Sequence, residues 1–157
     1  MRAKLDKILE WLLVIFLAAM TIDVIWGVFT RYAMGHQSSW TDELARFLMI
    51  WVGILGAAYA SGKNHHIAID LLPNYLTDKN KRRLEILIAA IVVVFVACVF
   101  LIGGLRYVYI SFKLGQSSPA LDLPMGAIYS VFPIAGICIM YYKINELYHY
   151  LNKTEKE

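Results

Sequence analysis

Residues 84–105 read LEILIAAIVVVFVACVFLIGGL and contain a single charged side chain, Glu85. An α-helix rises about 1.5 Å per residue, so a run of this length spans about 30 Å, the thickness of the hydrocarbon core of a bilayer. The run shows neither the alternation of a strand nor the polar stripe of a soluble helix. Because lipid offers no hydrogen-bond partner to the backbone, we expect it to cross a membrane as a helix.

Three more apolar runs lie at about 8–29, 44–61 and 124–142. Across all 157 residues, 59% are hydrophobic and only 17% are charged, which is unlike a soluble domain. The first run is too long for the core of a signal peptide and ends without a small-residue cleavage site. The sequence therefore predicts one all-α integral membrane domain with four transmembrane helices, at about 8–31, 40–62, 83–114 and 123–150.

The basic residues are distributed unevenly between the two sides of this arrangement. The N-terminal tail, the loop between the second and third spans and the C-terminal tail hold 11 of the 15 Lys and Arg residues. Loops rich in Lys and Arg stay in the cytoplasm. Both termini and the middle loop are therefore expected to be cytoplasmic.

The middle loop contains an apolar segment, HIAIDLLPNYL at residues 66–76, that is too short to span a bilayer. A short amphipathic helix at about 66–77, lying in the plane of the lipid headgroups, fits this composition, although a plain connecting loop is the alternative. Anionic lipid would then contact the basic cluster that follows, formed by Lys79, Lys81, Arg82 and Arg83.

The second span begins with the charged stretch SSWTDELAR, residues 38–46. Ser39 is a candidate N-cap, and Asp42 and Glu43 would lie in the first turn, where the helix dipole favours acids. Arg46 is spaced to reach either carboxylate. Two interpretations stay open: a self-neutralised helix start, or a buried Asp42–Arg46 bracket that fixes the helix against a neighbour.

Asp23 is an acidic residue within the first span, in its outer half. An ionisable group at this depth needs a partner or a function. Arg46 and Arg106 have the closest estimated depths, so the leading interpretation is an Asp–Arg pair between spans. An ion site or a proton relay is the alternative.

Small residues recur along one side of the second span. Gly53, Gly56, Ala57 and Ala60 have the spacing that lets membrane helices approach closely, either within the chain or against another subunit. In the fourth span, Pro133 predicts a kink.

Several classes of function are disfavoured. Cys98 and Cys138 lie inside apolar runs, and the histidines all fall in loops or at span ends, away from the facing positions that a haem requires. The sequence shows no catalytic triad, phosphate loop or zinc motif, and no basic tract that indicates nucleic acid. We expect no catalytic residue, metal site or cofactor, and no enzyme. Two alternatives remain: a small homodimeric proton-coupled exporter that uses Asp23, and a membrane anchor of a redox complex.

A set of motifs in order along the chain resembles a known family. It comprises Arg31-Tyr32, Trp40 followed by Thr-Asp-Glu-Leu-Ala-Arg46, Trp51, Gly56-Ala57-Ala58, His66-Ile67, Asp70, Leu123-Pro124, Tyr129 and Pro133. The pattern is similar to the small, Q-type (DctQ-like) membrane subunit of tripartite ATP-independent periplasmic (TRAP) transporters. Asp42-Glu43 stands where that family frequently has two glutamates.

The resemblance implies a bacterial inner-membrane system of three proteins. A large multi-spanning subunit would form a stable heterodimer with this chain and move an organic acid, such as a C4-dicarboxylate or sialic acid, using sodium ions bound in that large subunit. A periplasmic substrate-binding protein would dock transiently. This chain would be a scaffold in contact with phospholipids, with no substrate-binding residue of its own. Its candidate docking residues are His36, Trp40, Gln116 and Asp122.

Overall fold

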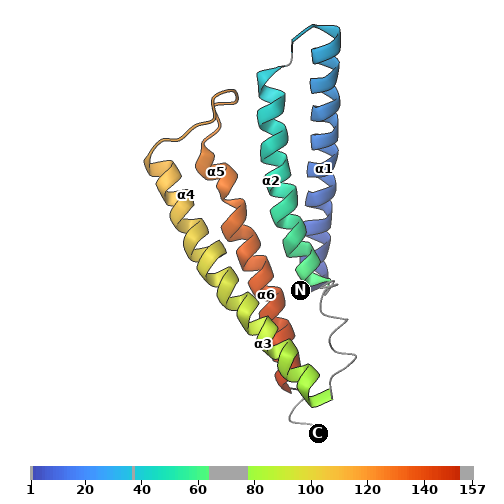
Figure 1. The fold of residues 1–157 in the computed structure, drawn as a ribbon, viewed down its shortest axis with the longest axis vertical. Helices are drawn as coiled ribbons and strands as arrows, with labels where there is room; N and C mark the ends of the chain where they lie inside the picture. Colours follow the sequence, from blue (N-terminus) through green and yellow to red (C-terminus); the bar gives the residue numbers. More distant parts are fainter. Residues whose placement is uncertain (1, 37, 64–77, 153–157) are drawn as a thin grey trace.

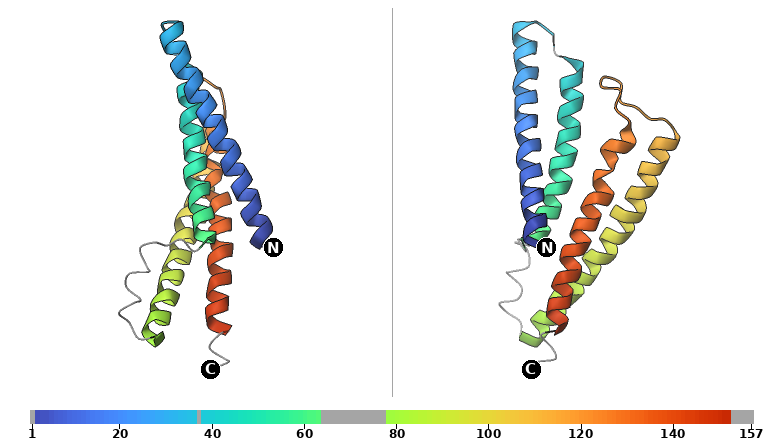
Figure 2. Two further views of the ribbon diagram at one scale, coloured as in Figure 1. Left: turned by 90° about the vertical axis from the view of Figure 1, so that its right-hand side faces the viewer. Right: turned by 180° about the vertical axis from the view of Figure 1, so that it is seen from behind.

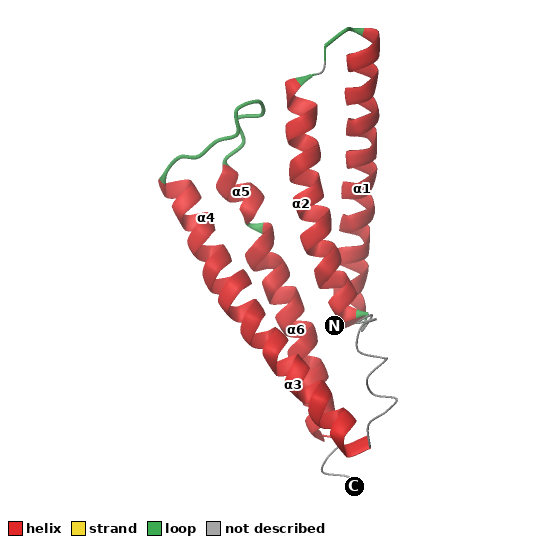
Figure 3. Ribbon diagram, in the orientation of Figure 1, coloured by secondary structure: helices red, strands yellow, loops and turns green. Residues whose placement is uncertain are grey.

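The computed structural model describes residues 2–36, 38–63 and 78–152. Its helical segments are α1 Arg2–Ala33, α2 Ser39–Gly62, α3 Asp78–Val96, the π-helical segment η2 Ala97–Gly103, α4 Gly104–Lys113, α5 Met125–Tyr129 and α6 Val131–Asn152. Figures 1 and 3 show α3, η2 and α4 following one another as a single rod. No strand is present in the described residues.

Among the described residues, four helices are long and apolar enough to cross a membrane: Arg2–Ala33, Ser39–Gly62, Ile86–Lys113 and Met125–Leu147. They confirm the expected all-α class with four transmembrane helices. The predicted amphipathic helix at 66–77 lies outside the described residues.

The helices form two antiparallel hairpins, α1 with α2, and the α3–η2–α4 rod with α5–α6. The start of α1 and the end of α6 lie toward the same end of the bundle, which we call the termini end. The opposite end, the loop end, carries the α1–α2 connection and residues 114–124 between α4 and α5. Figures 1 and 2 show the hairpins close together toward the termini end and separated toward the loop end.

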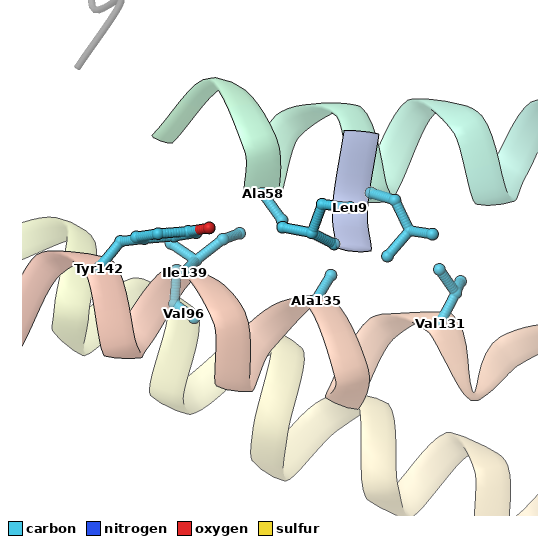
Figure 4. Packing of buried hydrophobic residues seen from close by; sticks show 8 residues of the cluster. Leu9, Ala58, Val96, Val131, Ala135, Ile139 and Tyr142 are labelled. Atoms are coloured by element: carbon cyan, nitrogen blue, oxygen red, sulfur yellow. The ribbon is translucent and has the colours of Figure 1, made fainter. Parts of the chain in front are cut away.

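The core lies where the hairpins meet, and α6 is its central helix. Half of the apolar window of α5–α6 is buried, against 11% for α1. Figure 4 shows side chains of α6 directed at α2 and α1. The buried cluster consists of Leu9, Leu55, Ala58, Val96, Val131, Ala135, Ile139 and Tyr142.

Glycines mark the closest helix contacts. A Cβ atom added to Gly62 would lie 2.7 Å from the Tyr142 ring, and one added to Gly136 would lie 2.9 Å from Cβ of Phe100. Such positions accept only glycine unless a neighbour moves, so Gly62 fixes the approach of α2 to α6, and Gly136 that of α6 to η2.

The small residues of α2 that the sequence indicated for helix packing do not lie at these close contacts. Gly53, Ala57 and Ala60 are exposed, no atom comes within 4 Å of a Cβ at Gly53, and Gly56 meets Leu13 of α1 at 4.0 Å. Within this chain, the inward side of α2 is the one with Leu55 and Ala58. Of the two alternatives, packing within the chain does not apply to Gly53, Ala57 and Ala60, and packing against another subunit stays a prediction.

The fourth span is interrupted at Ser130, between α5 and α6, within one turn of Pro133. Proline has no N–H, so the carbonyl of Tyr129 cannot receive the regular helical hydrogen bond. Beside this break, the Ser130 hydroxyl donates to the Ala127 carbonyl at 2.6 Å. The break agrees with the kink expected from Pro133, whereas the π-helical segment η2 had no recognised sequence pattern.

Candidate functional site

Glu43 connects the two hairpins at the loop end. It lies in the second turn of α2, and its Oε2 atom accepts hydrogen bonds from the backbone N–H groups of Ala120, at 2.8 Å, and Leu121, at 3.0 Å. Hydrogen bonds to an ionised acceptor are roughly twice as strong as those between neutral groups. Glu43 thus holds residues 114–124 against the start of α2.

Residues 114–124 form a closed turn with bonds of its own. Ser118 donates its N–H to the Leu123 carbonyl at 2.9 Å, and Met125 donates to Gln116 at 2.9 Å. Asp122, with a positive φ of 52°, donates its N–H back to Ser118 at 3.1 Å. Aspartate tolerates this left-handed conformation better than most residues. The loop therefore presents a fixed surface.

The four candidate docking residues lie at this end and are exposed: His36, Trp40, Gln116 and Asp122. His36 belongs to the α1–α2 connection and Trp40 to the first turn of α2, while Gln116 and Asp122 belong to the loop that Glu43 holds. The structure brings them to one end of the bundle, although they come from both hairpins.

The start of α2 differs from the expected cap. The N-cap is Ser38, in an extended conformation and without a side-chain capping bond, and Ser39 is the first helical residue. The Thr41 hydroxyl donates to the Ser38 carbonyl at 2.7 Å. Asp42 does lie in the first turn, as expected, whereas Glu43 bonds to the distant loop. The assignment of Ser39 as the cap is corrected.

The expected ion pairs with Asp23 are not formed. Asp23 is buried, with 4% of its surface exposed, and neither carboxylate oxygen has a hydrogen-bond partner among the described residues. Arg46 and Arg106 are both exposed. Arg106 belongs to the other hairpin, which is separated from α1 at this end (Figure 1). Asp42 and Arg46 are both exposed, so they form no buried bracket within this chain.

An exposed stripe follows one side of α2. Its members recur every three or four residues, the spacing of one helix face: Arg46, Met49, Gly53, Ala57 and Ala60. We call this set the α2 stripe. It combines small residues, which allow close approach of another helix, with a charged side chain that lipid solvates poorly.

A second set of polar contacts lies at the termini end. Arg2 donates to the Gly62 carbonyl at 2.5 Å and lies over the Tyr142 ring, 5.9 Å from its centroid. The Tyr142 hydroxyl donates to the Asp6 carboxylate. Buried Lys143 pairs with Glu146 at 2.7 Å. Sequence reasoning missed the contacts of Arg2 with Gly62 and of Tyr142 with Asp6, because nothing in the spacing of residues so distant in the chain indicates contact.

Two remaining predictions concern metals and lipid contacts. In the described ranges, no group of three or more His, Cys, Asp or Glu side chains could hold a metal. The basic positions Lys79, Lys81, Arg82 and Arg83 fall at the beginning of α3, and their lipid contacts stay a prediction.

Comparison with known proteins identifies the relatives of this chain. The model of the family "Tripartite ATP-independent periplasmic transporters, DctQ component" matches residues 20–152. A TRAP transporter small permease protein of Haemophilus influenzae is 31% identical over 135 residues, covering 86% of this chain and 82% of the relative. The sialic acid TRAP transporter small permease protein SiaQ of Vibrio cholerae is 25% identical over 138 residues, covering 84% and 80%.

A third relative is much longer. The sialic acid TRAP transporter permease protein SiaT of Haemophilus influenzae is 28% identical over 144 residues, which cover 87% of this chain but 22% of the relative. A segment similar to most of this chain is therefore one part of a larger permease polypeptide.

Proposed function

This chain belongs to the DctQ component family of tripartite ATP-independent periplasmic transporters, and from that premise we propose that it is a scaffold subunit that braces a large transport subunit. The family is a transporter component and not an enzyme. The family match also leaves the exporter and redox-anchor alternatives without support.

The proposal of a stable heterodimer with a large subunit rests mainly on the long relative. In SiaT, a segment similar to this chain is covalently part of a larger permease protein. Two subunits can be joined in one polypeptide without loss of function when they work in the same complex with one copy of each. The separate chain would then bind its large partner permanently.

The α2 stripe is the surface that we assign to this contact. Gly53, Ala57 and Ala60 would let a helix of the large subunit approach to backbone distance. Arg46 would pair with an acid of the partner, since a lone guanidinium facing hydrocarbon costs several kcal/mol, about 3 or more on insertion scales. The stripe lacks an internal role, which supports an external one.

The loop end is the surface that we assign to the periplasmic substrate-binding protein. The two hydrogen bonds that Glu43 accepts from Ala120 and Leu121, which we call the Glu43 clasp, keep residues 114–124 in one conformation. Docking would therefore cost little conformational entropy in this loop. Exposed His36, Trp40, Gln116 and Asp122 supply polar and aromatic contacts. The excess of Lys and Arg at the termini end supports a periplasmic loop end in a bacterial inner membrane, with both termini cytoplasmic.

The transported substrate is proposed to be an organic acid. A relative named for sialic acid supports this class, and the family resemblance extends it to C4-dicarboxylates. Substrate and coupling sodium ions are proposed to bind in the large subunit, and phospholipids to contact the basic start of α3. No cofactor is proposed for this chain.

Co-purification tests the bracing role. Gly53→Leu fills the α2 stripe, and we expect it to weaken recovery of the large subunit with the tagged chain by about tenfold, the effect of about 1.4 kcal/mol. Ala18→Leu is the matched control, because Ala18 is also exposed but lies on α1. Equal recovery from both variants would show that the α2 stripe is not the contact.

A further inference from the structure

We propose that a cavity between α1 and α2 receives a side chain from a transmembrane helix of the large subunit, and that Asp23 accepts a hydrogen bond from it. The cavity has a volume of about 100 Å³ and lies toward the loop end of this hairpin. Asp23 and Gly27 line it from α1, and Thr41 and Ala45 line it from α2. This inference rests on the proposed scaffold role and adds a contact on α1 to the one assigned to α2.

Asp23 is buried but has no hydrogen-bond partner among the described residues. Its surface is 4% exposed, and both carboxyl oxygens are enclosed and unpaired. Such a group destabilises the chain in either protonation state, because a neutral carboxyl still has a donor and an acceptor to satisfy. Asp23 also lines the cavity, so a partner can reach it there. We therefore expect the missing hydrogen bond to come from another molecule.

The groups around the cavity favour a donor as the occupant. The Thr41 hydroxyl already donates to the Ser38 carbonyl, so its oxygen is left as an acceptor, like the carboxylate of Asp23. Gly27 and Ala45 keep the space open, since neither has a large side chain. One water needs about 10–15 Å³, so the cavity has room for the end of a side chain that carries N–H or O–H groups.

The depth of Asp23 selects a partner inside the membrane. Ten residues separate Asp23 from Ala33, the last residue of α1, which places it about 15 Å from that end of the helix. Its neighbours Ile22 and Val24 are exposed and apolar, as expected of a surface that faces lipid or another membrane helix. A soluble protein docked on the loop end stays outside this depth, whereas a transmembrane helix packed along the hairpin reaches it.

The cavity adjoins the α2 stripe, which is the surface already assigned to the large subunit. Asp42 lines the cavity and precedes Arg46 by four residues, so the two lie on one face of α2. Val24 and Val28 line the cavity from α1 and are exposed, so the cavity opens to the outside of the hairpin. A helix that packs along the stripe would therefore pass the opening and place one side chain in it.

Two measurements on Asp23→Leu test the proposal, because leucine fills a similar volume without hydrogen-bonding atoms. In the isolated chain in lipid nanodiscs, loss of the unpaired carboxyl should raise Tm by about 2–4 °C. In co-purification, the same variant should lower recovery of the large subunit by about tenfold, because the donor of the partner is left unpaired. Thr21→Val is the matched control and should change neither value, because Thr21 is exposed on α1 and its hydroxyl bonds to the Leu17 carbonyl.

Unchanged recovery with Asp23→Leu would overturn the proposal. A lower Tm of the isolated variant would also contradict it, because Asp23 would then stabilise this chain by itself. Gly53→Leu separates this result from the bracing role. If only Gly53→Leu loses the large subunit, the stripe is a contact and the cavity is not. If only Asp23→Leu loses it, the cavity is confirmed and the stripe is not the contact. If neither loses it, both assignments fail.

Crosslinking decides the matter if Asp23→Leu does not fold. A small diazirine side chain placed at Val24, beside the opening, should crosslink to the large subunit in the assembled complex. The same group at Ile22, which is exposed on a different side of α1, should not. Absence of a crosslink from position 24, or equal crosslinking from both positions, would contradict the proposal.

Discussion

Glu43 joins two parts of the chain that are linked by no local sequence pattern. Its carboxylate is close enough to two consecutive backbone N–H groups to accept both, and these belong to a loop between α4 and α5. The same residue read from sequence alone is an ordinary first-turn acid near a helix dipole. The contact depends on where the second hairpin places its loop, which only the fold determines.

Replacing Glu43 with glutamine should loosen that loop. Gln keeps one oxygen acceptor but loses the charge, so the two hydrogen bonds weaken by about 1 kcal/mol in total. Amide exchange at Ala120 and Leu121 should become several-fold faster, measured by hydrogen–deuterium exchange in nanodiscs. Glu10→Gln is the control, because Glu10 is exposed on α1 at the other end of the bundle. Unchanged exchange in Glu43→Gln would mean that the loop's own hydrogen bonds hold it.

At the scale of elements, the apolar runs predicted which segments are helices but not which side of each helix turns inward. A soluble helix reveals its buried face through a polar stripe on the other side. In a membrane both faces are apolar, because lipid and core are equally so. The sequence therefore located α2 correctly but left open whether Gly53 packs within the chain or against another subunit. In the structure Gly53 faces outward, while Gly62 forms the close contact inside the chain. The π-helical turn of η2 escaped notice for a similar reason, since its residues are as apolar as those around them.

A matched pair of alanine substitutions separates these two faces of α2. Gly62→Ala places a methyl group 2.7 Å from the Tyr142 ring, and overpacking of this kind costs about 1–3 kcal/mol. Gly53→Ala meets no atom within 4 Å and removes a helix-weakening glycine, so it should be neutral or stabilising by up to about 1 kcal/mol. Unfolding of the isolated chain with denaturing detergent, followed by circular dichroism, measures both. Equal stability of the two variants would show that the Gly62–Tyr142 contact does not limit packing.

At the scale of the whole molecule, an even number of spans and the distribution of charge lead to the same topology. The structure places the start of α1 and the end of α6 toward one end of the bundle, and most Lys and Arg residues belong to segments at that end. The positive-inside rule then assigns the loop end to the periplasm. Polar contacts join the two hairpins at both ends of the bundle. The Glu43 clasp lies at the loop end, and the contacts of Arg2, Asp6 and Tyr142 lie at the termini end.

Single cysteines introduced at the two ends test this orientation. With Cys98 and Cys138 replaced by alanine, Gln116→Cys should react in intact spheroplasts with a thiol reagent that cannot cross the membrane, because Gln116 is exposed at the loop end. Lys7→Cys, exposed near the termini end, should react only after the membrane is permeabilised. The reverse pattern would invert the topology and move the docking surface to the cytoplasm. Labelling of both residues in intact spheroplasts would indicate two orientations in the membrane, which the strong charge asymmetry argues against.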